Sequence, residues 1–136
     1  MSMKNPKVAV VSLNWNGAEH LENFLPTAVG LEYSDFIIVI VDNGSTDRSI
    51  KFIRENYPDV HIVSLKENLG YSKGFNKGIF YAIDLGVEYI LITNNDVKLQ
   101  KDILTCYSDN RSGAPKARSV GVLAGNRNPD YYFLDF

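Results

Sequence analysis

Short apolar runs alternate with segments of helical periodicity over most of the chain. The runs are rich in Val and Ile, and they are Val8–Leu13, Phe36–Val41, Val60–Leu65 and Tyr89–Thr93. Each run is nearly continuous instead of alternating between apolar and polar residues, as is typical of parallel strands buried on both faces. The pattern therefore predicts four buried strands with helices between them.

Between these runs, apolar residues recur three and four positions apart, which is the spacing of one helical face. The three stripes are Leu21, Phe24, Leu25, Ala28 and Val29, then Ile50, Ile53 and Tyr57, then Phe75, Ile79, Ala82 and Ile83. We expect Pro26 to bend or divide the first helix. Ser45 or Thr46 is the expected N-cap of the second helix, with Asp47 near its positive end. Gly86 is the expected C-terminal cap of the third.

A repeated strand–helix order is typical of βαβ units, which form a mainly parallel sheet with helices on both faces. We therefore predict an α/β fold, a Rossmann-like three-layer sandwich that forms a single domain over residues 1–136. After Lys98 the periodicity weakens. The remaining sequence predicts a short helix at Lys101–Tyr107, a loop at Ser108–Arg118, a strand at Val120–Ala124 and an aromatic tail at Asn126–Phe136.

Composition narrows the class of protein without identifying it. The chain has 136 residues, 45% of them hydrophobic, and a formal net charge of -2, so it can bury one core and offers no basic field to nucleic acid. The single cysteine, Cys106, cannot form an internal disulfide, and we interpret it as a small hydrophobe on a helix. No run approaches the roughly 18 apolar residues of a membrane span. With no signal sequence recognised either, we expect a cytoplasmic protein.

Polar residues cluster directly after the predicted strands. Asn14, Trp15 and Asn16 follow the first strand, Asp42 and Asn43 the second, Asn68 and Gly70 the third, and Asn94, Asn95 and Asp96 the fourth. The carboxyl ends of parallel strands share one edge of a sheet, and open α/β sheets bind their ligands there. We therefore predict a ligand site at this edge.

Several candidate residues also have a purely structural interpretation. Asp42 can hydrogen-bond a base or a ribose, but Asp-Asn-Gly is equally common turn chemistry. Asp47 is better explained by the start of a helix. Trp15 is either a stacking platform for a base or a core aromatic. His20 and His61 lack metal-ligand spacing, and we interpret both as structural.

The run Asn94-Asn95-Asp96 ends a buried strand with three polar side chains, which is more than an exit turn requires. Asp96 offers the hard oxygen ligands that suit Mg²⁺ or Mn²⁺. Asn94 is neutral, so it suits hydrogen bonding to a ribose or a diphosphate better than strong metal ligation. A strand-end cap is the alternative interpretation of the run.

Glycines recur at Gly70, Gly74 and Gly78, with Lys73 among them. They either bring backbone N–H groups and an ammonium to a ligand or allow close packing. The spacing matches neither the P-loop nor the dinucleotide fingerprint. The segment Asn14–Gly17 after the first strand also lacks that fingerprint, which argues against a dinucleotide-dependent oxidoreductase.

At this point the motifs resemble those of glycosyltransferase family 2, inverting enzymes of GT-A fold, and most closely the rhamnosyltransferase-like branch. The resemblance covers Lys7 to about Leu104, a nucleotide-sugar-binding portion (residues 7–104), and leaves residues 105–136 as a divergent segment. Four segments in order carry it: Val11–Gly17, Val41–Asp47, Glu67–Gly78 and Leu91–Val97. It implies a GT-A fold, that of the nucleotide-diphospho-sugar transferases, in truncated form.

The resemblance implies donor binding by residues from all four segments. They are Leu13, Asn14, Trp15, Asp42, Asn68, Gly70, Lys73 and Asn94. In the family pattern, Leu13 and Trp15 would flank the nucleobase and Asp42 would bond it. Asn68 and Gly70 would line the base and ribose pocket, with Lys73 near it.

The family's DxD motif corresponds to Asn94 through Asp96, and Asp96 would hold the Mg²⁺ or Mn²⁺ that bridges the diphosphate. The chain departs from the pattern in three ways. Asn94 replaces the first Asp, as is usual in this branch, and Phe75 stands where many relatives have Arg. No segment matches the carboxylate general base, and Asp130 and Asp135 in the tail are not assigned to that role, so the catalytic residue is unknown.

The resemblance implies transfer of a sugar from a nucleotide-diphospho-sugar to a polysaccharide or lipid-linked acceptor, with weak or no activity for so short a chain. The alternative is a truncated, non-catalytic module that binds nucleotide-sugars or a partner. Peripheral association with the inner face of a membrane is left open. We also expect self-association through the aromatic residues of Tyr131–Phe136, because such a surface is normally covered.

Overall fold

A computed structural model describes residues 5–108 and 120–124. The elements, in chain order, are β1 (Val8–Asn14), α1 (Ala18–Val29), β2 (Phe36–Asp42), α2 (Ser49–Asn56), β3 (His61–Ser64), α3 (Tyr71–Asp84), β4 (Tyr89–Asn94), α4 (Ile103–Ser108) and β5 (Val120–Ala124). Strands and helices alternate as the sequence predicts.

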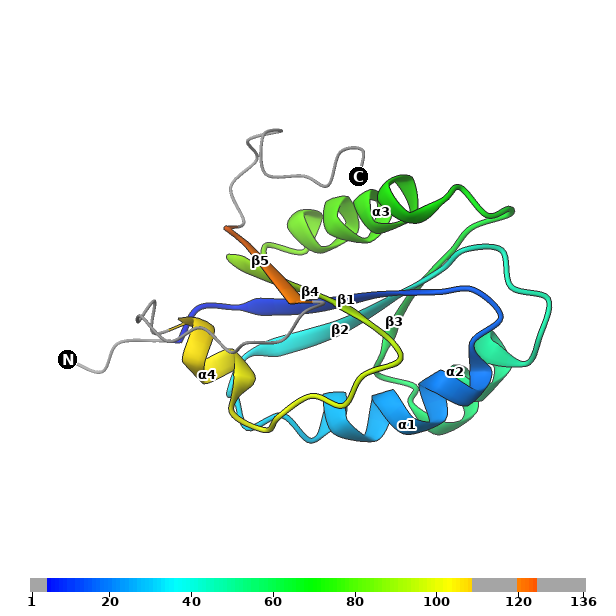
Figure 1. Ribbon diagram of the computed structural model, residues 1–136. Coiled ribbons are helices and arrows are strands. Elements are labelled where there is room, and N and C mark those ends of the chain that lie inside the picture. Colours follow the sequence, from blue (N-terminus) through cyan, green and yellow to red (C-terminus); the bar gives the residue numbers. More distant parts are fainter. Residues whose placement is uncertain (1–4, 109–119, 125–136) are drawn as a thin grey trace.

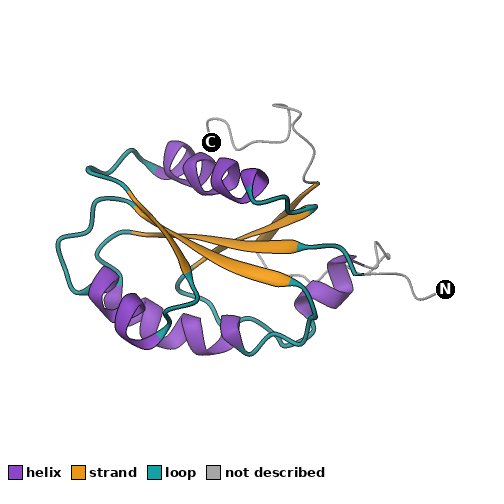
Figure 2. Cartoon of the chain, turned by 180° about the vertical axis from the view of Figure 1, so that it is seen from behind, coloured by secondary structure: helices purple, strands orange, loops and turns teal. Residues whose placement is uncertain are grey.

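One five-stranded sheet, in the order β3-β2-β1-β4-β5, runs through the middle of the fold. The first four strands are parallel, and β5 pairs antiparallel with β4. Helix α3 lies over one face, and α1, α2 and α4 lie under the other (Figure 1). Seen from behind, the same three layers are visible (Figure 2). The predicted α/β sandwich with a mainly parallel sheet is therefore confirmed.

Side chains on each strand alternate between two apolar clusters, one on each face of the sheet. In β1, Val10 packs with Leu21 and Phe24 of α1. Its neighbour Val11 packs with Phe75 and other residues of α3. Because both faces are covered, the strands consist of continuous apolar runs, which is why their positions could be predicted from the sequence.

Helix α1 differs from its prediction in two respects. It is not divided, because it runs unbroken from Ala18 to Val29 with Pro26 inside it. Proline removes one backbone hydrogen bond, and the fully buried Phe24 and Leu25 beside it keep the helix against the sheet. Val29 was predicted to face the core but is 47% exposed, because it is the last residue of the helix.

Helix α2 begins at Ser49, so the prediction that Ser45 or Thr46 caps it is wrong. The Asp47 carboxylate instead accepts hydrogen bonds from two helix N-termini, with Oδ1 bonded to Ser49 N at 3.0 Å and Oδ2 to Ala18 N at 3.1 Å. Burial alone would raise the pKa of Asp47, but these hydrogen bonds and the nearby Arg48 lower it. The expected role of Asp47 at a helix start is confirmed.

The end of α3 is capped as predicted. Gly86 has a φ of +82°, which favours glycine, and its N–H donates to Ile83 O at 2.9 Å. Val87 N donates to Ala82 O at 3.5 Å, which completes a Schellman-type cap. The cap turns the chain into β4.

The predicted helix and strand after Lys98 are present as α4 and β5. The predicted loop within 108–118 lies almost entirely outside the described residues, as do Asp130, Asp135 and the aromatic tail, so its self-association stays a prediction. Strand β3 is shorter than expected: it covers His61–Ser64, and Val60 and Leu65 lie just outside it. In the part of the chain that the structure describes, no helix is long and apolar enough to cross a membrane.

Candidate functional site

The polar clusters after the parallel strands meet at the carboxyl edge of the sheet. Asn14 at the end of β1 lies opposite Asp42 of β2. On the other side of β1, Leu13 lies opposite Asn94 of β4. Asp42 in turn lies opposite Ser64, the last residue of β3. The predicted convergence on one edge is confirmed, and it brings together residues up to 81 positions apart in the sequence.

The pleat of the strands places these residues on two sides of the edge. Helix α3 covers Leu13 and Asn43, because a Cβ added to Gly74 would lie 2.7 Å from Leu13 Cδ1 and 3.1 Å from Asn43 Nδ2. Asn14 and Asp42 alternate with these two and belong to the opposite side, toward α1 and α2. The edge therefore has two layers with separate hydrogen-bond networks.

The layer toward α1 and α2 is a buried chain of side-chain hydrogen bonds that joins three strand ends. Asn95 Nδ2 donates to Asn14 Oδ1 at 2.8 Å, and Asn14 Nδ2 donates to Asp42 Oδ1 at 3.0 Å. The other oxygen, Asp42 Oδ2, accepts from Ser45 N at 3.0 Å. Asn14 and Asp42 are each 1% exposed. The Asp42 carboxylate thus stabilises the turn after β2 by accepting a backbone hydrogen bond from it.

The layer under α3 fixes the loop between β3 and α3. Asn43 Nδ2 donates to Asn68 Oδ1 at 2.9 Å and to Gly70 O at 3.2 Å, and Leu69 N donates to Asn43 Oδ1 at 2.9 Å. Gly70 begins α3 with φ +87° and ψ 177°, a conformation essentially restricted to glycine. Asn68 and Gly70 are nevertheless exposed, so they form a rigid rim that a ligand can reach.

Two of the three glycines have the packing role that the sequence left open as one interpretation. A Cβ added to Gly78 would lie 2.4 Å from Val41 Cγ2 and 2.8 Å from Val11 Cγ1, so Gly78 lets the helix approach the sheet. Gly74 packs in the same manner on Leu13. Gly70, in contrast, has nothing within 4 Å of an added Cβ and provides a backbone conformation.

Trp15 is 57% exposed, so its interpretation as a core aromatic is wrong. It follows β1 at the carboxyl edge and offers an indole surface to solvent. Lys73 in the first turn of α3 and Asp96 after β4 are also exposed. A cation, a carboxylate and a large aromatic are therefore accessible around the rigid rim.

Tyr71, which the sequence did not single out, connects α3 to the end of β4. Its hydroxyl donates to Asn94 Oδ1 at 3.3 Å. Its ring packs edge-on against the buried Phe75, with centroids 4.8 Å apart. Burial raises the pKa of the Tyr71 phenol, so the hydroxyl stays protonated and able to donate near neutral pH.

The acidic groups at the edge limit the kind of cation site that these residues could form. Among residues 5–108 and 120–124, no three His, Cys, Asp or Glu side chains lie close enough to hold a metal ion. Asp96 is exposed and the Asn94 oxygen already accepts a hydrogen bond. Mg²⁺ and Mn²⁺ often bind through one or two carboxylates together with substrate phosphates. The residues present therefore fit a cation that is shared with a phosphorylated ligand.

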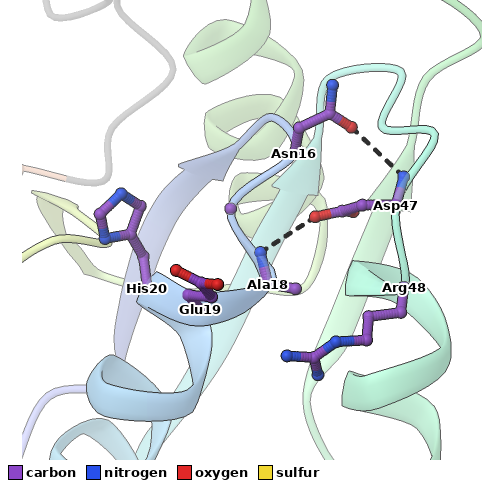
Figure 3. A pocket seen from close by; sticks show the side chains of 7 residues that line it. Asn16, Ala18, Glu19, His20, Asp47 and Arg48 are labelled. Carbon is purple, nitrogen blue, oxygen red and sulfur yellow. Dashed lines mark hydrogen bonds between the residues drawn. The ribbon is translucent and has the colours of Figure 1, made fainter.

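A hollow of about 440 Å³ lies at the N-termini of α1 and α2, beside this edge (Figure 3). Its lining residues are Asn16, Gly17, Ala18, Glu19, His20, Asp47 and Arg48. Asn16 Oδ1 accepts from Thr46 N at 2.8 Å and from Asp47 N at 3.3 Å, and these hydrogen bonds fix one wall of the hollow. His20, expected to be structural, is exposed here. His61 is structural as predicted, since its Nδ1 lies 2.8 Å from Tyr81 Oη.

Sequence reasoning missed the roles of Asn43, Asn95, Asn16 and Tyr71. The three asparagines lie beside residues that were singled out. Their side-chain amides, which can donate and accept at once, were the feature that could have indicated a role in connecting loops. Tyr71 gave no comparable signal, because its partner Asn94 is 23 positions away.

Together, the sheet order, the polar carboxyl edge and its glycine rim define an α/β protein with a candidate ligand site at the ends of its parallel strands. The sequence profile described as glycosyl transferase family 2 matches residues 8–106. The chain belongs to this family, and the resemblance inferred from its motifs is confirmed.

Characterised relatives cover a range of sugar transfers. The chain is 29% identical over 129 residues to an N-acetylglucosaminyl-diphospho-decaprenol L-rhamnosyltransferase of Mycobacterium tuberculosis, covering 89% of this chain and 41% of the relative. It is 26% identical over 132 residues to the dTDP-rhamnosyl transferase RfbF of Shigella flexneri, covering 95% and 42%. The chain therefore spans about two fifths of the length of these relatives.

Solved structures confirm the fold. The S. aureus TarS 1-349 structure in complex with UDP has a TM-score of 0.68 at 20% identity, covering 76% of this chain and 31% of that one. The mannosyltransferase PcManGT from Pyrobaculum calidifontis, in complex with GDP-Man and Mn2+, has a TM-score of 0.64 at 22% identity, covering 81% and 34%. The GT-A type of α/β fold is thus shown for this chain.

Proposed function

We propose that this chain binds the nucleotide-diphospho-sugar donor of a glycosyl transfer reaction at the carboxyl edge of its sheet. The observation that carries the proposal is the rigid rim formed by Asn43, Asn68 and Gly70 beside the exposed Trp15 and Asp96. This edge combines an aromatic surface for a base, amides for a ribose and a carboxylate for a cation. Family membership and the UDP and GDP-Man complexes of similar folds support it.

In this proposal, the nucleoside lies against the end of β1 and the rim. Trp15 stacks on the base and Leu13 contacts its other face. The resemblance assigns the base edge to Asp42, whose carboxylate is 1% exposed and already accepts from Asn14 Nδ2 and Ser45 N, so a base would reach it only at the floor of the edge. Asn68 and Gly70 line the ribose pocket.

The diphosphate then lies toward β4 and the start of α3. Lys73 contributes a positive charge there, and Asn94 contributes hydrogen bonding. Asp96 would hold the divalent cation, Mg²⁺ or Mn²⁺. A bound cation of this kind neutralises negative charge that develops on a departing diphosphate.

For transfer, an acceptor hydroxyl attacks the anomeric carbon from the face opposite the diphosphate, and a general base takes the hydroxyl proton. We assign no general base among the described residues. By analogy with the relatives, the acceptor is a polysaccharide or a lipid-linked saccharide. Because the chain spans about two fifths of the relatives' length, donor binding without transfer is the second candidate function.

Isothermal titration calorimetry with UDP, GDP and dTDP, with and without Mn²⁺, tests donor binding. We expect Mn²⁺-dependent binding of at least one nucleotide, and its loss in Asp96→Ala. Asp84→Ala is the matched control, because Asp84 is an exposed carboxylate at the opposite end of α3. Metal-independent binding, or equal binding by the Asp96→Ala variant, would contradict the proposal. Sugar transfer to a lipid-linked acceptor would exclude the non-catalytic alternative.

A further inference from the structure

The side-chain amide of Asn94 makes one hydrogen bond within the described residues, through its oxygen and not its nitrogen. Its Oδ1 accepts the Tyr71 hydroxyl, while its Nδ2 donates to no group in residues 5–108 and 120–124. Asn94 is partly exposed at the carboxyl edge, next to the rim that begins α3. The amide therefore presents a free N–H donor group to the site.

The Tyr71 side chain is 48% exposed, and its ring is supported from one side. Its ring packs edge-on on Phe75, which is fully buried against the sheet. Phe75 is one helical turn further along α3, so the two rings are fixed by the same helix. In the hydrogen bond present, the phenol donates and the Asn94 oxygen accepts, so the amide nitrogen faces away from Tyr71.

From this geometry we infer that Tyr71 is a positioning residue that turns Asn94 into a hydrogen-bond donor for the diphosphate. The inference rests on the proposed donor-binding function. A phosphate oxygen carries negative charge and accepts hydrogen bonds only, so it pairs with the Asn94 N–H group and not with its oxygen. Asn94 is accordingly not a cation ligand, although it occupies the first position of the family's acidic motif.

Asp96 is the only carboxylate of the motif, and the Asn94 oxygen, which accepts the Tyr71 hydroxyl, does not supplement it as a cation ligand. A single exposed carboxylate binds Mg²⁺ or Mn²⁺ weakly, and phosphate oxygens supply the remaining ligands. The cation is therefore recruited together with the nucleoside diphosphate and not before it.

The test compares Tyr71→Phe with Tyr81→Phe. Each variant removes one hydroxyl from α3 and keeps the ring, but the Tyr81 hydroxyl bonds His61 and lies away from Asn94. Calorimetry measures the affinity for the preferred nucleoside diphosphate with Mn²⁺, and for its monophosphate. In the free protein, side-chain amide NMR resonances of Asn94 report its orientation directly.

We expect Tyr71→Phe to weaken diphosphate binding roughly threefold to tenfold, the range of one hydrogen bond, with less effect on the monophosphate. Tyr81→Phe should stay within about twofold of wild type on the same scale. In an Asn94→Ala background, Tyr71→Phe should add nothing, because the two residues act as one unit. The Asn94 amide resonances should shift in Tyr71→Phe and not in Tyr81→Phe.

Wild-type affinity in Tyr71→Phe, or an undiminished effect in the Asn94→Ala background, would overturn the inference. Unshifted Asn94 resonances would overturn it through the free protein alone. If wild type binds no nucleoside diphosphate, the proposed function fails and the diphosphate role of Asn94 fails with it. A shifted Asn94 amide in that case would still identify Tyr71 as the residue that orients it.

Discussion

Asn14 donates its side-chain amide to the carboxylate of Asp42 across 3.0 Å, at the ends of two neighbouring parallel strands. Both side chains are buried, and Asn14 also accepts a hydrogen bond from Asn95 of the next strand end. One asparagine therefore uses its donor and its acceptor to connect the loops after β1, β2 and β4. The expected base contact and the expected cation ligand belong to loops that this residue holds together.

Replacing Asn14 with Ala should lower the free energy of unfolding by about 1–3 kcal/mol, because Asp42 loses a partner while remaining buried. Nucleotide affinity should fall as well, since two loops of the edge lose their connection. Urea denaturation measures the first effect and calorimetry the second. Asn23→Ala, which removes an exposed amide bonded to Glu19 O on α1, is the control and should leave both nearly unchanged.

Asp47 provides a prediction about pH. Its carboxylate accepts hydrogen bonds from Ala18 N and Ser49 N, and its pKa in the folded protein lies below its ordinary value of 3.8. The stability that it contributes is thus fully present above about pH 4, the range in which an unfolded Asp is ionised. It is lost as the pH falls through the lowered pKa of the folded state.

We therefore expect Asp47→Ala to destabilise the protein by about 0.5–2 kcal/mol at neutral pH, as for removal of a helix cap. The difference from wild type should shrink as the pH falls below about 4, where Asp47 becomes protonated. Chemical denaturation at several pH values measures it, with Asp84→Ala as the control for removing an exposed carboxylate. A difference that is constant from pH 7 to about pH 2 would contradict this explanation.

Trp15 is the only tryptophan of the chain, so its fluorescence reports on one position at the edge. If a base stacks on it, titration with the bound nucleotide should quench the emission. Trp15→Ala should weaken nucleotide binding by about tenfold, within the usual range for a base–aromatic stack, and hardly affect stability because the indole is 57% exposed. Phe80→Ala on α3, an aromatic of 47% exposure, is the matched control. Unchanged emission at saturating nucleotide would rule out the stacking.

The parts of the fold that follow from local patterns could be predicted from the sequence. The strands were visible because covered faces require continuous apolar runs, and Gly86 was recognisable because few other residues end a helix with a positive φ. The start of α2 was misplaced, because Ser45 and Thr46 look like N-caps in sequence. In the structure Ser45 Oγ accepts from Asn16 N at 2.8 Å instead, a contact across 29 positions that no local pattern contains.

In the candidate site, too, the overall placement could be predicted from the sequence but the individual side-chain contacts could not. The edge itself followed from topology, since polar residues after parallel strands must share it. The burial of Asp42 and the partners of Asn14, Asn43 and Asn94 did not, because they depend on which way each side chain points after its strand ends. The pleat sends Asn14 and Asp42 to one side and Leu13 and Asn43 to the other, and a shift of one residue would exchange them.

Asn94→Asp tests whether the cation arrives with the nucleotide. The substitution places a second carboxylate two positions from Asp96, still beside the Tyr71 hydroxyl, which can donate to it. We expect measurable Mn²⁺ binding in the absence of nucleotide, where wild type shows little, because two carboxylates suffice for a partial site. Electron paramagnetic resonance of free Mn²⁺ measures this binding, and adding Asp96→Asn to the variant should abolish the gain. Clear Mn²⁺ binding by wild type without nucleotide, equal to that of Asn94→Asp, would mean that Asn94 already ligates the cation through its oxygen, and that Tyr71 does not determine which half of the amide faces the ligand.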